Sequence, residues 1–259
     1  MATQAPLDAK LDIGRVIQRG FEAIGRRVGM FVALSLLLVG LPNVLVQWLH
    51  IDNNQALNLS AFLSPLYWLA VLVSMLSGFL LQAAVVRVTI RDLRGESVDL
   101  ADNLVEALKL LLPMVGLMIL ISLVAGLGLV FLIVPGIILY IMFIVAVPVL
   151  VQERRGVIGS MVRSAELTRG SRWRIFLLLL LFLVAYMVVG GVIGAIAGVS
   201  LVSLDVASVQ GSSLLLAAVQ AIMSAIVGLL AAVMIASLYV ELRIVREGTT
   251  MTGLAEIFA

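Results

Sequence analysis

The stretch RWRIFLLLLLFLVAYMVVGGVIGAIAG (172–198) decides the fold class, because it contains no charged residue after Arg174. A bilayer core about 30 Å thick is crossed by a helix of about 20 apolar residues, and this stretch exceeds that length. A helix that is apolar all round lies either in the core of a large protein or in a membrane. The sequence therefore predicts a transmembrane helix here.

The rest of the chain is also rich in apolar residues and poor in charged ones. Apolar types make up 63% of the 259 residues and charged types only 12%, whereas soluble domains carry roughly 45–50% and about 25%. Too little charge is present to solvate a soluble surface. The predicted spans are 28–49, 62–86, 110–130, 136–152, 173–198 and 213–240. We predict one all-α domain over 1–259, a polytopic membrane protein with six transmembrane helices.

The basic residues predict an orientation. Of the 17 Lys and Arg residues, five precede the first span, four lie between spans two and three, six lie between spans four and five, and two follow the last span. The other connections contain none. Lys and Arg concentrate in cytoplasmic loops, so both chain ends are expected in the cytoplasm.

Three cytoplasmic segments have the pattern of amphipathic helices. In 12–28, 98–111 and 156–168, apolar side chains recur at helical spacing opposite polar ones, and Asp12 suits a helix N-cap. Such helices lie in the membrane interface. The segments suggest a threefold arrangement of interfacial helix, span, outer turn and span, although sequence identity between the units is too weak to prove a duplication.

The connection between spans three and four is unusual, because GLGLVFLIVPG (126–136) is apolar where an outer loop is polar. Pro135 and Gly136 are expected to break the helix there. The segment is expected to stay at membrane depth, packed on protein; whether it is re-entrant is left open. Pro148, inside span four, is expected to kink that span.

A stripe of small residues, Gly190, Gly194 and Gly198, runs along span five. Small residues let helix backbones approach closely. The stripe predicts either packing within the chain, against the alanine-rich span six, or a dimer face. Packing within the chain is the favoured interpretation.

The loop between spans four and five carries the candidate lipid contacts. Arg154, Arg155, Arg169 and Arg172 lie where anionic headgroups would meet the protein, at about 1 kcal/mol per basic residue near the surface. We expect these four arginines to need no buried partner. Glu153 ends span four and is expected to contact an arginine of the 154–174 loop, with Arg163, across the short turn that follows, as the first candidate.

Few residues suited to catalysis are present. There is no cysteine and one histidine, His50, so no metal site rich in these residues is expected, and no nucleotide-binding or zinc motif occurs. The acidic residues within 92–106 are expected to form a solvated face. We therefore expect no cofactor, no metal, no catalytic residue and no nucleic-acid partner.

Several stretches carry a family resemblance. They are LDIGRVIQRGFEAIGRRVGMF (11–31), IVPGIILYIMFIVAVPVLVQERRG (133–156), RSAELTRGSRWRIF (163–176) and LYVELRIVREG (238–248). Together they resemble the membrane domain of the glycerophosphoryl diester phosphodiesterase membrane-domain family. In some relatives this domain precedes a soluble phosphodiesterase domain. Here only 241–259 follow the last span, and one histidine cannot supply that family's metal site, so no catalytic residue is carried over.

The resemblance implies a stand-alone protein of the bacterial inner membrane. The favoured hypothesis is a non-catalytic protein that engages anionic lipid, a membrane protein partner or a second copy of itself, in support of envelope homeostasis. The alternative is a transporter or permease component for a weakly polar or lipid-like substrate. The absence of charge from the middle of every predicted span weighs against ion coupling. A membrane-embedded hydrolase that uses cytoplasmic carboxylates is the third hypothesis.

Overall fold

A computed structural model of the chain describes residues 11–44, 64–93, 100–203 and 209–247. These residues are almost entirely helical, and none of them is in a strand. The elements in chain order are α1 (Ile13–Arg26), α2 (Val28–Ser35), a π-helical turn η1 (Leu36–Gly40), α5 (Pro65–Leu93), α6 (Leu100–Lys109), α7 (Leu111–Phe131), α8 (Ile133–Phe143), α9 (Ala146–Glu153), α10 (Gly156–Thr168), α11 (Arg172–Ser203) and α12 (Val209–Glu247).

The predicted fold class is confirmed. Within the described ranges, five helices are long and apolar enough to cross a membrane, and a sixth span results if one bent pair of helices is counted as one. The five are Pro65–Asp92, Leu111–Gly128, Ile133–Glu153, Arg172–Gly191 and Ala221–Glu247. The bent pair joins Ile13–Arg26 to Val28–Val44 at 92°. The chain is thus an all-helical, multi-pass membrane protein.

The predicted amphipathic segments form separate helices. They are α1, α6 and α10. Asp12 caps α1, as expected, because its side chain accepts hydrogen bonds from the amides of Gly14 and Arg15. α1 buries Val16, Gly20 and Ala23 on one face. The helical spacing of apolar residues therefore predicts which face of α1 packs against the other helices.

Two predicted span ends fall short of the helices that contain them. α5 continues past 86 to Leu93, and α12 continues past 240 to Glu247. The extra turns carry Arg87, Asp92 and Glu241, and each of these side chains forms an ion pair with another helix. A helix therefore extends beyond its apolar stretch where its charged residues find partners.

The connection between α7 and α8 differs from the prediction. Pro135 and Gly136 do not break a helix: they lie inside the first turn of α8, where proline removes an amide that has no intrahelical partner. The break is Leu132, whose backbone is extended, with φ −157° and ψ 128°. The tip is not packed on protein either, because the side chains of Leu132, Ile133 and Val134 are about two-thirds exposed (65%, 69% and 67%).

A second interruption matches the kink expected from Pro148. The helix leaves its regular path at Ile144 and Val145, and α9 begins at Ala146, which places Pro148 in its first turn. Proline clashes with the carbonyl four residues before it, here that of Ile144. The residues from Ala146 to Val151 are buried, so the interruption lies in the best packed part of the molecule.

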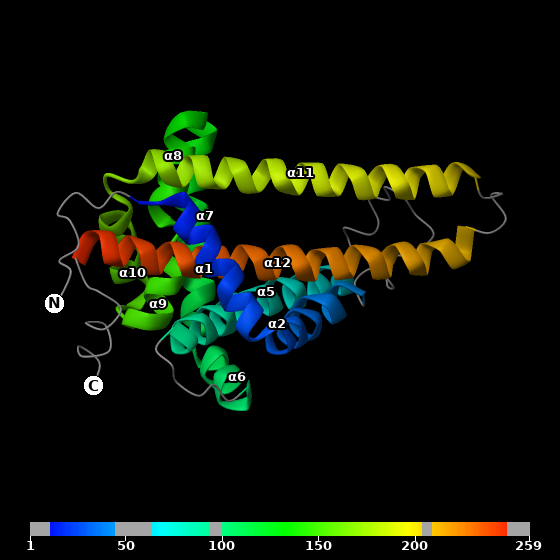
Figure 1. The fold of residues 1–259 in the computed structure, drawn as a ribbon, viewed down its shortest axis with the longest axis horizontal. Helices are drawn as coiled ribbons and strands as arrows, with labels where there is room; N and C mark the ends of the chain where they lie inside the picture. The colour runs from blue at the N-terminus through cyan, green and yellow to red at the C-terminus, as the bar shows by residue number, and fades with distance from the viewer. Residues whose placement is uncertain (1–10, 45–63, 94–99, 204–208, 248–259) are drawn as a thin grey trace.

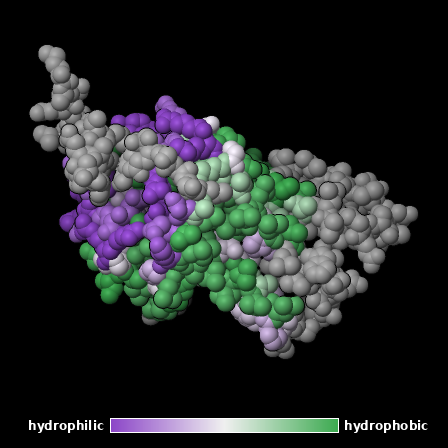
Figure 2. All heavy atoms as spheres, turned by 90° about the horizontal axis from the view of Figure 1, so that it is seen from below, coloured by the Kyte–Doolittle hydropathy of each residue, from purple (hydrophilic) through white to green (hydrophobic). Residues whose placement is uncertain are grey.

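The long helices and the hairpin take different directions. α5, α11 and α12 run along the long axis of the molecule, whereas α7 and α8 run across it (Figure 1). The first residues of α1 and the last residues of α12 lie at the same end. Hydrophilic side chains gather at that end, and apolar side chains cover the surface beside it (Figure 2). We call it the charged end; it comprises α1, α6, α10 and the last turns of α5 and α12.

Candidate functional site

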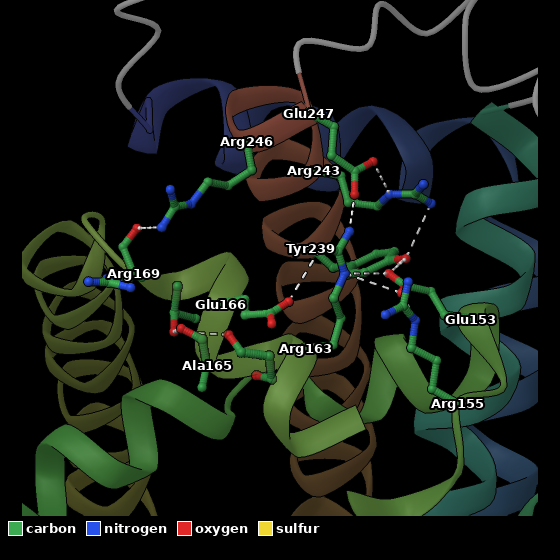
Figure 3. Close-up of polar contacts among 12 residues, drawn as sticks. Glu153, Arg155, Arg163, Ala165, Glu166, Arg169, Tyr239, Arg243, Arg246 and Glu247 are labelled. Carbon is green, nitrogen blue, oxygen red and sulfur yellow. Dashed lines mark hydrogen bonds and ion pairs between the residues drawn. The ribbon is translucent and has the colours of Figure 1, made fainter. Parts of the chain in front are cut away.

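The first cluster at the charged end joins α9, α10 and α12 (Figure 3). Arg163 Nε lies 3.2 Å from Glu153 Oε2, so the expected contact between these residues is present. The Tyr239 hydroxyl donates to Glu153 Oε1 over 3.1 Å. Arg163 also pairs with Glu247, which in turn lies 3.0 Å from Arg243 Nε. Five side chains from three helices therefore share one network.

The turn between α9 and α10 makes this network possible. Arg154 adopts a left-handed conformation with φ 48°, and Gly156 follows with φ 71°. Left-handed backbone ends a helix and reverses the chain, so α10 folds back beside Glu153. Only glycine adopts this region without cost. Arg154 therefore has a backbone role in addition to its charge.

The electrostatics of the network favour fixed charges. Burial removes water from Arg163 and would lower its pKa, but the carboxylates of Glu153 and Glu247 outweigh this effect and raise it. Glu153 is only 7% exposed and also pairs with Arg155, at 2.8 Å. The arrangement joins α9, α10 and α12 at the charged end.

A second cluster fixes α1. Glu241 on α12 is fully buried, and Arg19 Nη1 lies 2.5 Å and Arg15 Nη2 3.3 Å from its carboxylate oxygens. At the other end of α1, Arg27 Nε lies 2.6 Å from Asp92 of α5. Unpaired, a buried carboxylate is costly, so these arginines hold the interfacial helix against α5 and α12.

A third cluster fixes α6. Glu106 lies 2.6 Å from Lys109 Nζ and 2.8 Å from Arg154 Nη2. The Lys109 hydrogen bond and charge, with help from Arg87 and Arg154, lower the pKa of Glu106. Asn103 is buried; it accepts from Arg87 Nε and donates to the Ala84 carbonyl.

The acidic residues of this region are thus not simply a solvated face. Asp92 and Glu106 are ion-paired, Asp102 is exposed, and Glu96 and Asp99 lie outside the described residues. In the described part of the chain, no group of three or more His, Cys, Asp or Glu residues is placed to hold a metal ion.

The four candidate lipid contacts divide into two pairs. Arg154 and Arg155 are exposed but ion-paired, with Glu106 and Glu153. The expectation that all four need no buried partner is therefore wrong for Arg155, because Glu153 is buried. The tight turn between α9 and α10 brings Arg155 close to Glu153. Arg169 and Arg172 have no carboxylate partner among the described residues, and the buried Nε of Arg172 has no hydrogen-bond partner there.

Two further arginines belong with the unpaired ones, and the sequence did not single them out. Arg246 Nη2 donates to the Arg169 carbonyl over 2.6 Å, and Arg174 Nη1 donates to the Leu11 carbonyl over 2.6 Å. Neither has a carboxylate partner in the described ranges. We call Arg169, Arg172, Arg174 and Arg246 the unpaired arginines.

Part of this group lines an open pocket of about 350 Å³. Its lining residues are Arg163, Glu166, Leu167, Arg169, Arg246 and Glu247. The pocket shares Arg163 and Glu247 with the network of Figure 3. It joins the end of α10 to the end of α12, where Arg169 and Arg246 are 77 residues apart in sequence. No sequence signal pairs these two segments.

The glycine stripe of α11 does not pack as expected where it is described. Gly190 and the adjacent Gly191 are exposed, and a Cβ atom added at either would meet nothing within 4 Å. The surroundings of Gly194 and Gly198 lie outside the described side chains. Packing against α12 is therefore not seen at Gly190, because α11 stands apart from α12 along this part of its length.

The comparisons with known proteins identify a family. A family model described as a domain of unknown function (DUF7847) matches residues 11–242, so the chain belongs to this family. No curated protein and no solved structure matches the chain significantly. The resemblance to the glycerophosphoryl diester phosphodiesterase membrane domain stays a prediction from the quoted sequence elements.

Proposed function

We propose that this member of the DUF7847 family is a non-catalytic membrane protein that engages anionic lipid headgroups at its charged end. The unpaired arginines carry the proposal. Arg15, Arg19, Arg27, Arg154, Arg155 and Arg163 each have a carboxylate within 4 Å. By contrast, Arg169, Arg172, Arg174 and Arg246 have none among the described residues.

This contrast supports a role for the unpaired group beyond stability. A guanidinium group binds phosphate oxygens through a planar set of N–H donors. A cation that pairs with an internal carboxylate has part of that capacity occupied, whereas one without such a partner can exchange water for a headgroup. The network of Glu153, Arg163 and Glu247 gives the unpaired arginines a rigid base.

The family resemblance suggests the location, and the charges suggest the orientation. We propose that the protein lies in a bacterial inner membrane, with the charged end and both chain termini on the cytoplasmic side, because basic residues are retained there. Anionic lipids of that leaflet would be the ligands, and a role in envelope homeostasis is consistent with such contact. A protein partner or a second copy would meet the exposed surface of α11.

Two double variants test the proposal. Arg169→Gln with Arg172→Gln removes two unpaired charges, and Arg154→Gln with Arg155→Gln removes two ion-paired charges. At about 1 kcal/mol per basic residue, the first variant should lose affinity for phosphatidylglycerol by roughly 30-fold. The second should lose less affinity, but it should unfold at a lower temperature because Glu106 and Glu153 lose partners.

Binding is measured by native mass spectrometry of detergent-solubilised protein titrated with phosphatidylglycerol or with phosphatidylcholine of the same chains. Correct insertion of each variant is checked first, since charge also orients spans. Equal loss of phosphatidylglycerol in the two variants would refute a special role for the unpaired arginines. Unchanged binding in both would refute headgroup recognition altogether.

A further inference from the structure

A groove lined only by apolar residues lies between α1, α11 and α12, and its volume is about 220 Å³. α11 contributes Leu178, Leu181, Phe182 and Ala185, which recur at helical spacing and so share one face. That face looks toward Leu230, Val233 and Met234 of α12 across the groove. The two long helices are thus separated by apolar space rather than by interdigitated side chains.

α1 closes the charged end of this groove. Ile17, Phe21 and Ile24 complete the lining, and Phe21 is 62% exposed. The ion pairs from Arg15 and Arg19 to Glu241 hold α1 in this position. The amphipathic helix therefore presents its apolar side chains to a space that no other described side chain fills.

Two polar groups mark the end of the groove that lies nearest the headgroup region. Arg174 lies one turn before Leu178 on the same face of α11, and it has no carboxylate partner among the described residues. Ser237 follows Val233 and Met234 along α12 and lies close to Gly20 of α1. Its hydroxyl is buried and finds no hydrogen-bond partner within the described ranges. The apolar groove thus leads to the guanidinium group of Arg174 and the hydroxyl of Ser237.

We propose that this groove holds one acyl chain of an anionic phospholipid, with the headgroup beside Arg174. The inference rests on the proposed function and names the lipid site within it. The lining offers no hydrogen bond to a polar solute, which excludes a sugar, a nucleotide or a peptide backbone from the groove. An acyl chain is favoured over a partner helix because the apolar groove ends near a cation and a buried hydroxyl, as the chain and headgroup of a phospholipid require.

The test fills the groove without adding charge. Ala185→Phe places a ring in the groove from α11. Val184→Phe is the matched control, because Val184 is exposed on the same helix but does not line the groove. Both proteins are taken from phosphatidylglycerol nanodiscs into mild detergent and examined by native mass spectrometry. The wild type and the control should retain one phospholipid, and Ala185→Phe should retain at least tenfold less.

A second measurement uses the unaltered chain, in case Ala185→Phe does not fold. Phosphatidylglycerol with a photoreactive diazirine in its chain is activated in proteoliposomes, and the labelled residues are mapped. Labelling of Leu181, Phe182 and Phe21 should saturate and should be displaced by unlabelled phosphatidylglycerol. Labelling of Val184 should rise in proportion to the concentration of the photoreactive lipid. Proportional labelling at all four positions would overturn the proposal.

The outcomes separate this site from the general proposal. Full lipid retention by Ala185→Phe overturns the groove assignment even if the Arg169 and Arg172 double variant loses headgroup affinity. Equal retention of phosphatidylcholine and phosphatidylglycerol overturns the anionic headgroup assignment. A retained second copy of the chain, released by Ala185→Phe, would show that the groove is a dimer contact and would also overturn the proposal.

Discussion

At the end of α9, Glu153 interacts with Arg155, Arg163 and Tyr239, which come from three parts of the chain. The contacts with arginines of the 154–174 loop could be predicted from the sequence, because a short turn brings the next helix back to the residue that precedes it. Tyr239 is 86 residues away, and nothing in its neighbourhood marks it as a partner. Local charge pairs are thus predictable where a turn fixes the geometry, and long-range ones are not.

Replacing Glu153 with Gln should destabilise the protein. Arg163 keeps Glu247, but Arg155 and Arg163 both lose a charged acceptor at a position that is 7% exposed, which costs about 1–3 kcal/mol. Glu166→Gln is the matched control, because Glu166 also pairs with Arg163 but is 59% exposed and should change stability by less than about 0.5 kcal/mol. Thermal unfolding in detergent measures both. Equal effects would show that the cluster is not a clamp.

Glu106 predicts a pH dependence. Its pKa is lowered, first by the hydrogen bond and charge of Lys109 and then by Arg87 and Arg154, from the ordinary value of 4.5. A carboxyl whose pKa is lower in the folded state stabilises that state above its unfolded pKa, and the contribution is lost as pH falls through the folded value. The protection of the α6 amides, measured as exchange relative to the intrinsic rate at each pH, should therefore fall as pH falls below about 4.5, so that relative exchange rises. Glu106→Gln should remove this additional rise; an unchanged profile would contradict the assignment.

Among the elements, the hairpin of α7 and α8 shows what the sequence could not predict. Proline was expected to end a helix, yet Pro135 lies in the first turn of α8, where it is tolerated. The reversal is instead made possible by a close approach: a Cβ atom on Gly128 would lie 2.8 Å from Leu139 Cδ1 and 3.0 Å from Gly136 Cα. The amphipathic helices were predictable because their pattern is local, whereas this packing depends on a partner helix.

Gly128→Ala should therefore destabilise the hairpin. The added methyl would contact the backbone of Gly136, so α7 and α8 must separate, and such overpacking costs about 1–3 kcal/mol. Gly126→Ala is the control on the same helix, because a Cβ atom there would meet nothing within 4 Å; it should be neutral or stabilising by up to about 1 kcal/mol through helix propensity. Thermal unfolding of the two variants gives the comparison. A stabilising Gly128→Ala would refute the close packing.

For the whole molecule, the described charged side chains that form the ion-pair clusters lie at the charged end. Buried residues also concentrate there, in the last turns of α5, in α9 and in α12 from Ala232 to Leu242. α11 is by contrast mostly exposed from Arg172 to Gly191, the part whose side chains are described. The Lys and Arg distribution in the sequence predicted that the basic residues gather at one end of the molecule. It did not predict that fewer side chains are buried away from the charged end, because burial depends on how the helices diverge in space.

The orientation can be tested with single cysteines, since the chain has none of its own. Ser64→Cys lies at the start of α5, far from the charged end, and Glu166→Cys lies on α10 within it. In intact bacterial cells, a membrane-impermeant maleimide should label Ser64→Cys and should label Glu166→Cys only after permeabilisation. The reverse pattern would invert the proposed orientation. Labelling of both in intact cells would contradict an odd number of crossings between them.

The tip of the hairpin decides how α7 and α8 sit in the bilayer. α7 is long enough to cross it, and α8 is long enough together with α9, but α7 and α8 run across the direction of α11 and α12 (Figure 1). Their tip exposes Leu132, Ile133 and Val134, which are costly to place in water and favourable in lipid. We therefore expect Leu132→Cys to resist the impermeant maleimide in intact cells and in inverted vesicles, and to react once detergent is added. Inverted vesicles that label Glu166→Cys supply the positive control. If intact cells label Leu132→Cys as fast as Ser64→Cys, the tip reaches the outer water, and α7 and α8 are two full crossings.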